Sequence, residues 1–247
     1  MKVKIICSEC FDEYVMDSSN TEKLTSSALD ISHVSCDMTD NAVFELSCNK
    51  GHKHKYFISN PKYELLYDMG VSAYLDGYYR EACLDFAACI ERFHEYCVYA
   101  MLCQNSNNIT GEIDNMWKVI KNQSERQYGA FVVLYTNTIG KPPTEQKRKW
   151  VEFRNDITHK GKIPSKKEAY DYAKYVCEYI KEKYTELSAK NDMHNGVIPK
   201  LRSLLEEDKE IRGISVTTFL LSVLIGNSSF EKEMDSFDEK YKLFYEK

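Results

Sequence analysis

The stretch that decides how this chain folds runs from Phe153 to Gly161 and reads Phe-Arg-Asn-Asp-Ile-Thr-His-Lys-Gly. Apolar residues recur in it at helical spacing, and a closing glycine is typical of a helix C-terminal cap. The pattern predicts the end of an amphipathic helix that carries Arg154, Asn155 and His159. Arginine can hold a phosphate and histidine can move a proton near neutral pH, so these side chains are the minimum set for cleaving RNA without a metal ion.

Arg154, the polar Asn155 beside it and His159 occupy the three positions of an R-x4-H motif, which resembles the signature of HEPN domains. HEPN domains are small all-helical modules, and the resemblance covers about residues 61–189. It implies a metal-independent endoribonuclease that acts as a homodimer, as a toxin or an antiviral-defence effector. An antitoxin or another regulatory protein is a further partner that it implies.

The motif also suggests a reaction in which the ribose 2′-hydroxyl attacks the adjacent phosphodiester. His159 acts as general base or general acid, and Asn155 orients the phosphate or the histidine. Arg154 binds the phosphate and stabilises the charge that grows in the transition state. The products are a 2′,3′-cyclic phosphate and a 5′-hydroxyl, so we expect DNA to survive.

Arg154 and His159 are five residues apart, which on a regular helix separates them by about 140° around the axis. Two arrangements bring them together. Either the helix loosens by Thr158, or two copies of the chain face each other and build one composite active site. The resemblance favours the dimer.

The motif also has a purely structural explanation. Arg154 then pairs with Glu152 or Asp156, and His159 caps the C-terminal end of its helix. Glu91, on an earlier predicted helix, either lies on a flank or faces the same groove, and the sequence leaves both open. The matching alternative function is a non-catalytic HEPN and zinc-ribbon module that binds nucleic acid or a protein partner.

The formal net charge of −5 argues against a protein that coats nucleic acid nonspecifically. Basic residues nevertheless gather around the motif. We therefore expect Lys149, Lys160 and Lys162 to contact RNA, although most charge runs of this kind are solvated helix faces.

A separate metal-binding unit is predicted for residues 1–60. Two short hooks, each following a predicted strand, supply two ligands apiece to one tetrahedral Zn²⁺. The four ligands are Cys7 and Cys10 in a C-x2-C hook, and Cys48 and His52 in a C-x3-H hook. The pattern resembles a zinc ribbon.

The fourth ligand has an alternative in His54, and His33 and Cys36 are also near but belong to no hook. A closed shell of four protein ligands performs no chemistry, so we expect the zinc to serve folding or docking. A zinc hydrolase is disfavoured, because the chain contains no H-E-x-x-H motif.

The expected fold class is mainly α: an HEPN-like helical bundle over residues 61–190, the small N-terminal β zinc ribbon before it, and a helical C-terminal extension over residues 191–247. Helical apolar spacing and helix-breaking residues place the elements of the bundle. The expected helices cover residues 62–75, 80–103, 112–121, 124–138, 144–160 and a long stretch from 166.

Helix-capping residues and inward-facing residues complete the expected bundle. Thr144 is the expected N-cap of the helix that carries the motif, and Ser165 forms a capping box with Glu168 at the start of the next. His94 is adjacent to a buried stripe and is expected to be a hydrogen-bonded core residue. The motif helix is expected to bury Trp150, Phe153 and Ile157.

The chain contains nine cysteines, but nothing in it indicates secretion, and five of them lie in helical patterns as expected reduced thiols. The N-terminus lacks the apolar region of a signal peptide, and the longest apolar run is far too short to span a bilayer. A cytoplasmic protein without membrane contact is the expectation.

Overall fold

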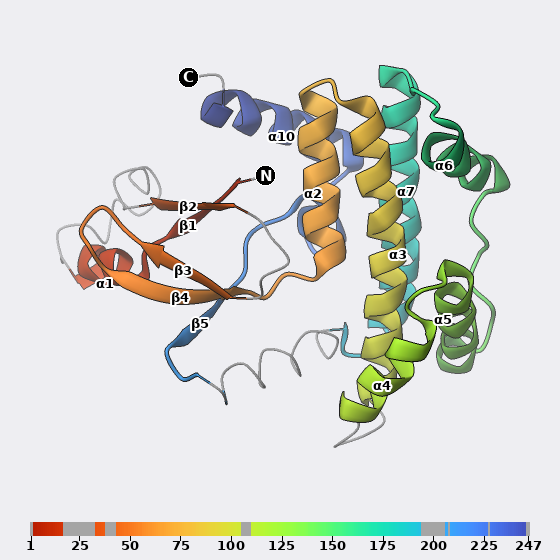
Figure 1. Ribbon diagram of the computed structural model, residues 1–247, viewed down its shortest axis with the longest axis horizontal. Helices are drawn as coiled ribbons and strands as arrows, with labels where there is room; N and C mark the ends of the chain where they lie inside the picture. The colour runs from red at the N-terminus through yellow and green to blue at the C-terminus, as the bar shows by residue number, and fades with distance from the viewer. Residues whose placement is uncertain are drawn as a thin grey trace. The chain divides into compact units, whose positions relative to one another are not determined.

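The structure is a computed structural model that describes residues 2–16, 33–37, 43–104, 110–193, 206, 208–226 and 228–245. The chain divides into two compact units. The first comprises Met1–Ser59 and Lys200–Val216, and the second comprises Asn60–Pro199 and Thr217–Lys247. The strands belong to the first unit and most of the helices to the second (Figure 1).

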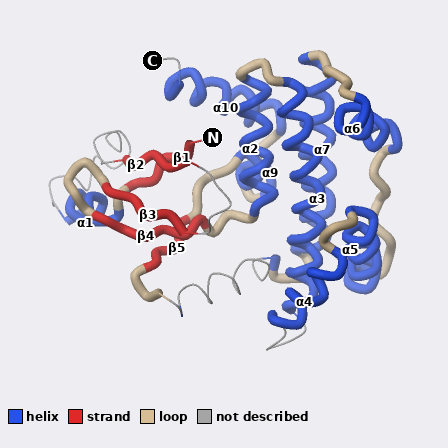
Figure 2. Tube along the Cα trace, in the orientation of Figure 1, coloured by secondary structure: helices blue, strands red, loops and turns tan. Residues whose placement is uncertain are grey.

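Three helices form the centre of the helical unit: α2 (Lys62–Leu75), α3 (Tyr79–Gln104) and α7 (Lys166–Ser188). They pack against one another in pairs and run alongside each other in Figure 2. The shorter helices are α4 (Thr110–Ile120), α5 (Ser124–Ile139), α6 (Arg148–Lys160), α9 (Phe219–Leu224) and α10 (Phe230–Tyr245). The expected mainly helical fold is therefore confirmed, and the bounds of α2 to α5 agree with expectation to within two residues.

Close packing between α2 and α3 depends on a glycine. A Cβ atom at Gly70 would lie 2.6 Å from the ring of Phe86, so only a residue without a side chain allows this approach. Apolar residues at helical spacing are expected to form a buried stripe on this helix, and all of them are buried in α3 apart from Ala87, which is half-buried: Cys83, Phe86, Ala87, Ile90, Phe93, Cys97 and Met101. The close approach at Gly70 lets α2 and α3 share an aromatic core at this point.

His94 is a core residue, as expected. Its Nε2 lies 2.9 Å from the hydroxyl of Tyr179, and its ring stacks on Phe131. Burial, with the charge of Lys183 as a smaller cause, lowers the pKa of His94 to about 3. The imidazole is therefore neutral in the folded protein at ordinary pH.

The start of α6 differs from expectation. The N-cap is Lys147 rather than Thr144, whose hydroxyl donates instead to Oε1 of Glu182 at 2.8 Å. The Lys147 N–H donates to the Tyr175 hydroxyl at 3.1 Å, so contacts with α7 hold the preceding segment outside the helix. Ser165 does form the expected capping box with Glu168 at the start of α7.

The C-terminal helices are attached to α2 through two buried carboxylates. Glu64 accepts a hydrogen bond from the hydroxyl of Thr218 at 3.0 Å, and Asp68 accepts one from the backbone N–H of Phe219 at 2.9 Å. These bonds satisfy polar groups at the beginning of α9. The segment after Val216 is therefore part of the helical unit.

The first unit contains two small sheets. Strand β1 (Lys2–Ile6) pairs antiparallel with β2 (His33–Asp37). In the second sheet, β3 (Val43–Ser47) and β4 (Lys53–Ile58) are antiparallel, and β5 (Ile211–Ile214) lies parallel to β4. Helix α1 (Ser8–Met16) follows β1 directly.

The domain limits therefore differ from the expected ones. Residues 191–247 are not a separate extension, since Lys200–Val216 belongs to the first unit and Thr217–Lys247 to the second. Strand β5 has only four residues and contains a glycine, so the sequence there shows no recognisable strand pattern. None of the described helices combines the length and the apolar character needed to cross a bilayer.

Candidate active site and metal centre

Helix α6 holds the predicted catalytic residues by burying its opposite face. Trp150, Phe153 and Ile157 are buried as expected, and they anchor the helix to the core. Arg154 and Asn155 are partly exposed, while His159 is fully on the surface in the last turn. The amphipathic pattern thus presents all three residues of the motif to solvent.

The C-terminal end of α6 is regular. The helix continues to Lys160, and Gly161 adopts the left-handed conformation with φ 69°. The backbone N–H groups of Gly161 and Lys162 both donate to the Asp156 carbonyl. The expected loosening at Thr158 is therefore wrong, because the glycine lets the helix end in a backbone-satisfied cap.

A regular helix keeps Arg154 and His159 apart. They remain about 140° from each other around the axis. Among the described residues, the His159 side chain makes no hydrogen bond or ion pair, either with Arg154 or with the end of its own helix. One copy of the chain does not assemble the motif into a single constellation.

Arg154 instead forms an ion pair with Glu91 of α3. Its Nη1 lies 3.3 Å from Oε1 of Glu91, and the two side chains are 30% and 37% exposed. The pairing with Glu152 or Asp156 that the structural explanation of the motif offered is not formed, since those carboxylates bind Arg148 at 2.8 Å and Lys160 at 2.7 Å. Both are i,i+4 pairs on the outer face of α6.

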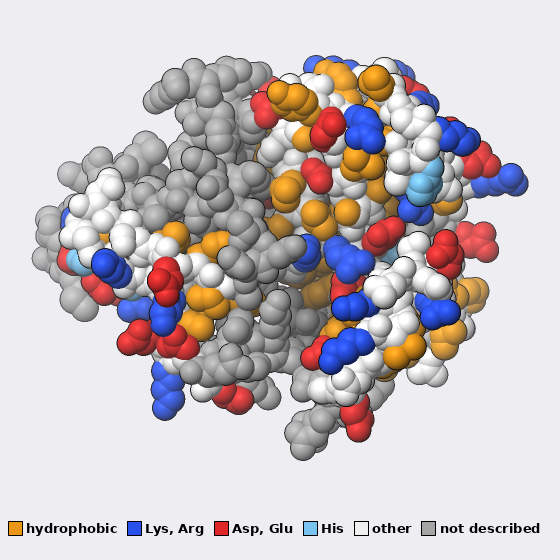
Figure 3. Space-filling model, in the orientation of Figure 1, with side chains coloured by type: hydrophobic (Ala, Val, Ile, Leu, Met, Phe, Trp, Pro, Cys, Tyr) orange, Lys and Arg blue, Asp and Glu red, His pale blue; other side chains and the backbone are white. Residues whose placement is uncertain are grey.

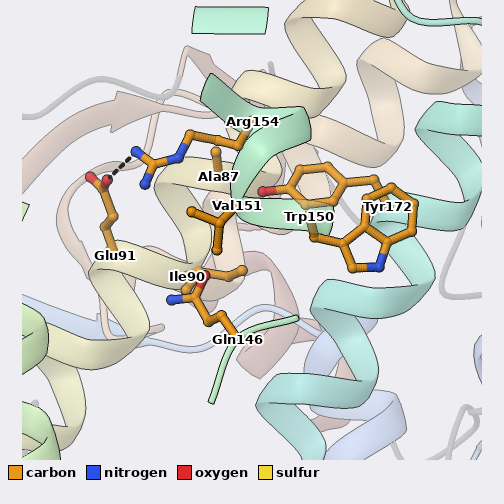
Figure 4. A pocket seen from close by; sticks show the side chains of 8 residues that line it. All are labelled: Ala87, Ile90, Glu91, Gln146, Trp150, Val151, Arg154 and Tyr172. Carbon is orange, nitrogen blue, oxygen red and sulfur yellow. Dashed lines mark hydrogen bonds and ion pairs between the residues drawn. The ribbon is translucent and has the colours of Figure 1, made fainter. Parts of the chain in front are cut away.

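The ion pair lies at a small open depression, here named the α6 hollow. It is lined by Ala87, Ile90, Glu91, Gln146, Trp150, Val151, Arg154 and Tyr172. Figure 4 shows the Arg154 side chain reaching toward Glu91, and the Tyr172 hydroxyl directed toward the side where Val151 and Arg154 lie. The hollow therefore combines a cation, an anion, a phenol and an amide with apolar walls.

The Tyr172 hydroxyl has no hydrogen-bond partner among the described residues, although Tyr172 is only 2% exposed. Burial raises the pKa of this phenol, and the nearby Arg154 opposes the rise. The hydroxyl is therefore a neutral donor in the α6 hollow. The oxygen itself is open to solvent through the hollow, although the rest of Tyr172 is buried.

The three predicted RNA-binding lysines differ in whether a carboxylate of the same chain pairs with them. Lys160 pairs with Asp156, and Lys162 pairs with Glu168 at 2.7 Å. Lys149 lies over the Trp150 ring at 4.3 Å and has no ion pair in the described part of the chain. Figure 3 shows basic and acidic side chains intermixed on the part of the helical unit where α6 lies.

The four predicted metal ligands come together in the first unit. Their ligand atoms all lie within 4.8 Å of one another, and the three cysteines are buried. The sulfur of Cys10 is 3.7 Å from that of Cys48, and Nδ1 of His52 is 3.5 Å from Cys10 and 3.6 Å from Cys7. A tetrahedral zinc with ordinary bond lengths requires about 3.8 Å between two sulfurs and about 3.5 Å between sulfur and nitrogen. The cluster is compatible with a zinc site.

His52 rather than His54 completes the cluster. The Nε2 of His52 lies 3.5 Å from a Glu9 oxygen and 3.7 Å from a Glu13 oxygen. His54 points instead toward Glu9, at 3.6 Å. A carboxylate behind the second ring nitrogen is the usual support of a metal-binding histidine.

The thiols of Cys48 and Cys10 differ in pKa. Burial raises the pKa of the Cys48 thiol, but backbone N–H groups of His52 and Lys50 outweigh it and bring the pKa to about 7. Burial and the neighbouring thiols raise the pKa of Cys10 to about 11. Donors directed at Cys48 favour the thiolate that a metal requires.

The two hooks have different backbones. Cys48 follows β3, and its C-x3-H hook closes through a Gly51 N–H bond to the Cys48 carbonyl at 2.9 Å. Cys7 follows β1, but Cys10 lies in the first turn of α1. The unit therefore differs from the strand-only ribbon that we expected. The side chains of His33 and Cys36 lie outside the described residues.

Comparison with known proteins does not assign the chain to a family. No protein-family model, curated protein or solved structure matches this chain.

Three acidic residues of these sites were not placed by sequence reasoning. Glu9 and Glu13 are four residues apart, a spacing that puts both on one face of α1 and could have indicated support for the histidine. Glu91 was considered, but nothing in the sequence shows that it meets Arg154, because the two are 63 residues apart on different helices.

Proposed function

We propose that this chain is a metal-independent endoribonuclease of the HEPN class, which cleaves RNA through its 2′-hydroxyl and leaves a 2′,3′-cyclic phosphate. The observation that carries the proposal is the state of Arg154 at the α6 hollow. The guanidinium has five N–H donors, and among the described residues it bonds only to Glu91. An arginine at an open hollow with most of its donors unused is suited to binding a phosphate.

The proposal includes a homodimer with a composite active site. Arg154 and His159 point away from each other on a regular helix, so a second copy is needed to bring a histidine to the arginine. His159 is exposed, and nearby Ile163 is an apolar side chain that is 82% exposed. The exposed position of His159 leaves it accessible to the second copy.

A non-catalytic module that binds nucleic acid or a protein is the second candidate. It is favoured by the pairing of Arg154, Lys160 and Lys162 with carboxylates of the same chain. Paired cations attract phosphates less strongly than free ones. A role as toxin or antiviral effector, control by an antitoxin or another regulatory protein, and a cytoplasmic setting belong to the first candidate.

The cysteine and histidine cluster is proposed to hold a structural zinc ion. All four ligands are protein side chains, which leaves no position for a substrate or a reactive water. The residues that would hold the ion are Cys7, Cys10, Cys48 and His52. The ion would stabilise a unit whose own apolar core is small.

The test is cleavage of a single-stranded RNA oligonucleotide by the purified full chain in EDTA, with circular dichroism to show that the protein stays folded. Wild type should cleave RNA but not the DNA of the same sequence, and leave 2′,3′-cyclic phosphate ends. Arg154→Ala and His159→Ala should each lose cleavage while remaining dimeric. Absence of cleavage by a folded wild-type dimer would favour the binding module.

Mixing the two inactive variants tests the composite site directly. If one copy supplies Arg154 and the other His159, half of the re-assorted dimers are mixed, and each has one intact site of two. The mixture should then recover about a quarter of wild-type activity. No recovery after proven subunit exchange would contradict a site shared in this way.

A further inference from the structure

Glu91 differs from the carboxylates that neighbour the motif in sequence. It comes from α3 rather than α6, and it meets Arg154 at the α6 hollow through one bond of 3.3 Å between Nη1 and Oε1 (Figure 4). Its second oxygen has no hydrogen bond among the described residues. A carboxylate that only fixes an arginine is commonly bidentate, with both oxygens used.

The surroundings of this pair favour a ligand over a closed structural contact. Glu91 remains 37% exposed on its side chain, so a substrate can reach it. The Tyr172 hydroxyl, in a residue only 2% exposed, lines the same hollow without a partner. Gln146 adds an amide to the lining. The hollow therefore presents hydrogen-bonding groups that the fold does not use.

We infer that Glu91 is the general base of the proposed ribonuclease and accepts the proton of the ribose 2′-hydroxyl. This role rests on the proposed function. It also assigns His159 the other role, that of the acid which protonates the leaving oxygen. The sequence had left the histidine as either base or acid.

The guanidinium of Arg154 can place the phosphate of the substrate beside Glu91. Its fork can keep one nitrogen on Glu91 and direct the others to the non-bridging oxygens of a phosphate. A phosphate bound there lies beside the carboxylate, because both are held by one planar group. The 2′-hydroxyl is on the ribose carbon next to the one that bears the 3′-oxygen, which places it within hydrogen-bond reach of Glu91.

The step balances within the site. The 2′-O–H bond breaks and its proton passes to Glu91, while the 2′-oxygen forms a bond to phosphorus. The bond from phosphorus to the 5′-oxygen breaks, and the His159 imidazolium gives that oxygen a proton. Water later returns both groups to their starting protonation states.

Glu91→Gln tests the role, since the amide has nearly the same shape but cannot accept the proton. Two quantities are measured on the full chain: the single-turnover cleavage rate of an RNA oligonucleotide, and the affinity for the 2′-O-methyl form of that RNA, which lacks the reacting hydroxyl. We expect cleavage to fall about 100-fold or more, with unchanged or tighter affinity. Glu152→Gln, which alters a carboxylate paired with Arg148 on the outer face of α6, should leave both unchanged.

Three results would overturn the inference. Cleavage by Glu91→Gln within threefold of wild type would show that no proton passes to this residue. Loss of affinity in proportion to the loss of cleavage would make Glu91 a positioning residue for Arg154. A wild-type protein that leaves RNA intact would overturn the proposed function itself, and the role of Glu91 with it.

Discussion

Replacing one ligand of the cysteine and histidine cluster should release its metal. The wild-type chain is expected to bind one zinc ion, with three sulfurs at about 2.3 Å and one nitrogen at about 2.0–2.1 Å. The spacing of the ligand atoms, 3.5–3.7 Å in three pairs of the cluster, is compatible with these bond lengths. X-ray absorption at the zinc edge reports the ligand count and both bond lengths.

The size of the effect follows from the number of ligands. Structural zinc sites bind the ion with an apparent free energy of about 10–16 kcal/mol. If the four ligands contribute equally, the loss of one ligand costs about 2.5–4 kcal/mol of that binding free energy. That corresponds to about 100- to 1,000-fold weaker affinity for zinc. Cys48→Ser should show this loss in competition with a chromophoric chelator at fixed pH. Hydrogen exchange should accelerate in the first unit, where Cys48 lies, more than in the helical unit.

Two controls make the result specific. Cys103→Ser changes a half-buried thiol on α3, outside the cluster, and should bind zinc like wild type. His54→Ala should also retain the ion, whereas His52→Ala should not, since only His52 lies among the three sulfurs. The reasoning fails if wild type binds far less than one zinc per chain, or if Cys48→Ser holds it as tightly.

Two predictions concern the helical unit. Because burial lowers the pKa of His94 to about 3, the unfolded chain binds one more proton than the folded chain between about pH 6.5 and pH 3, and folding stability falls as the pH falls through that range. Between pH 7.5 and 5.5 this term amounts to about 1.4 kcal/mol, so wild type should lose that much more unfolding free energy in urea than His94→Gln; equal losses would contradict it. Gly161→Ala should cost about 1–2 kcal/mol in thermal unfolding, because its φ of 69° is unfavourable for a residue with a Cβ atom. Gly129→Ala, in open space within α5, should instead be neutral or stabilising, and a similar loss in both variants would refute the argument.

The sequence predicted the features that depend on local patterning. Apolar periodicity located α2 to α5, the capping box at Ser165 located the start of α7, and Gly161 located the end of α6. The metal cluster could also be predicted from the sequence, because short hooks bring ligands together through local backbone geometry. In each case the physical cause lies within a few residues of the pattern.

The features that were missed depend on distant parts of the chain. The partner of Arg154 is Glu91, which meets it only once α3 and α6 have packed. Glu152 and Asp156, which the structural explanation named as its partners, lie two residues from it and pair instead with basic residues four positions away. Thr144 fits an N-cap pattern, yet contacts with α7 move the start of α6 to Arg148. Strand β5 is recognisable only through its pairing with β4.

The parallel pairing of β5 with β4 has a consequence for the order in which the protein folds during synthesis. Ile211 is the partner of Lys55, so the ribosome must make the intervening chain, including all of α2 to α7, before the sheet can be completed. The metal ligands, which end at His52, emerge long before that strand. Until then one edge of β4 is unpaired and open to wrong partners. The N-terminal unit is thus begun first but completed only after most of the helical unit has been made, and a metal ion bound early would hold its first part together in the meantime.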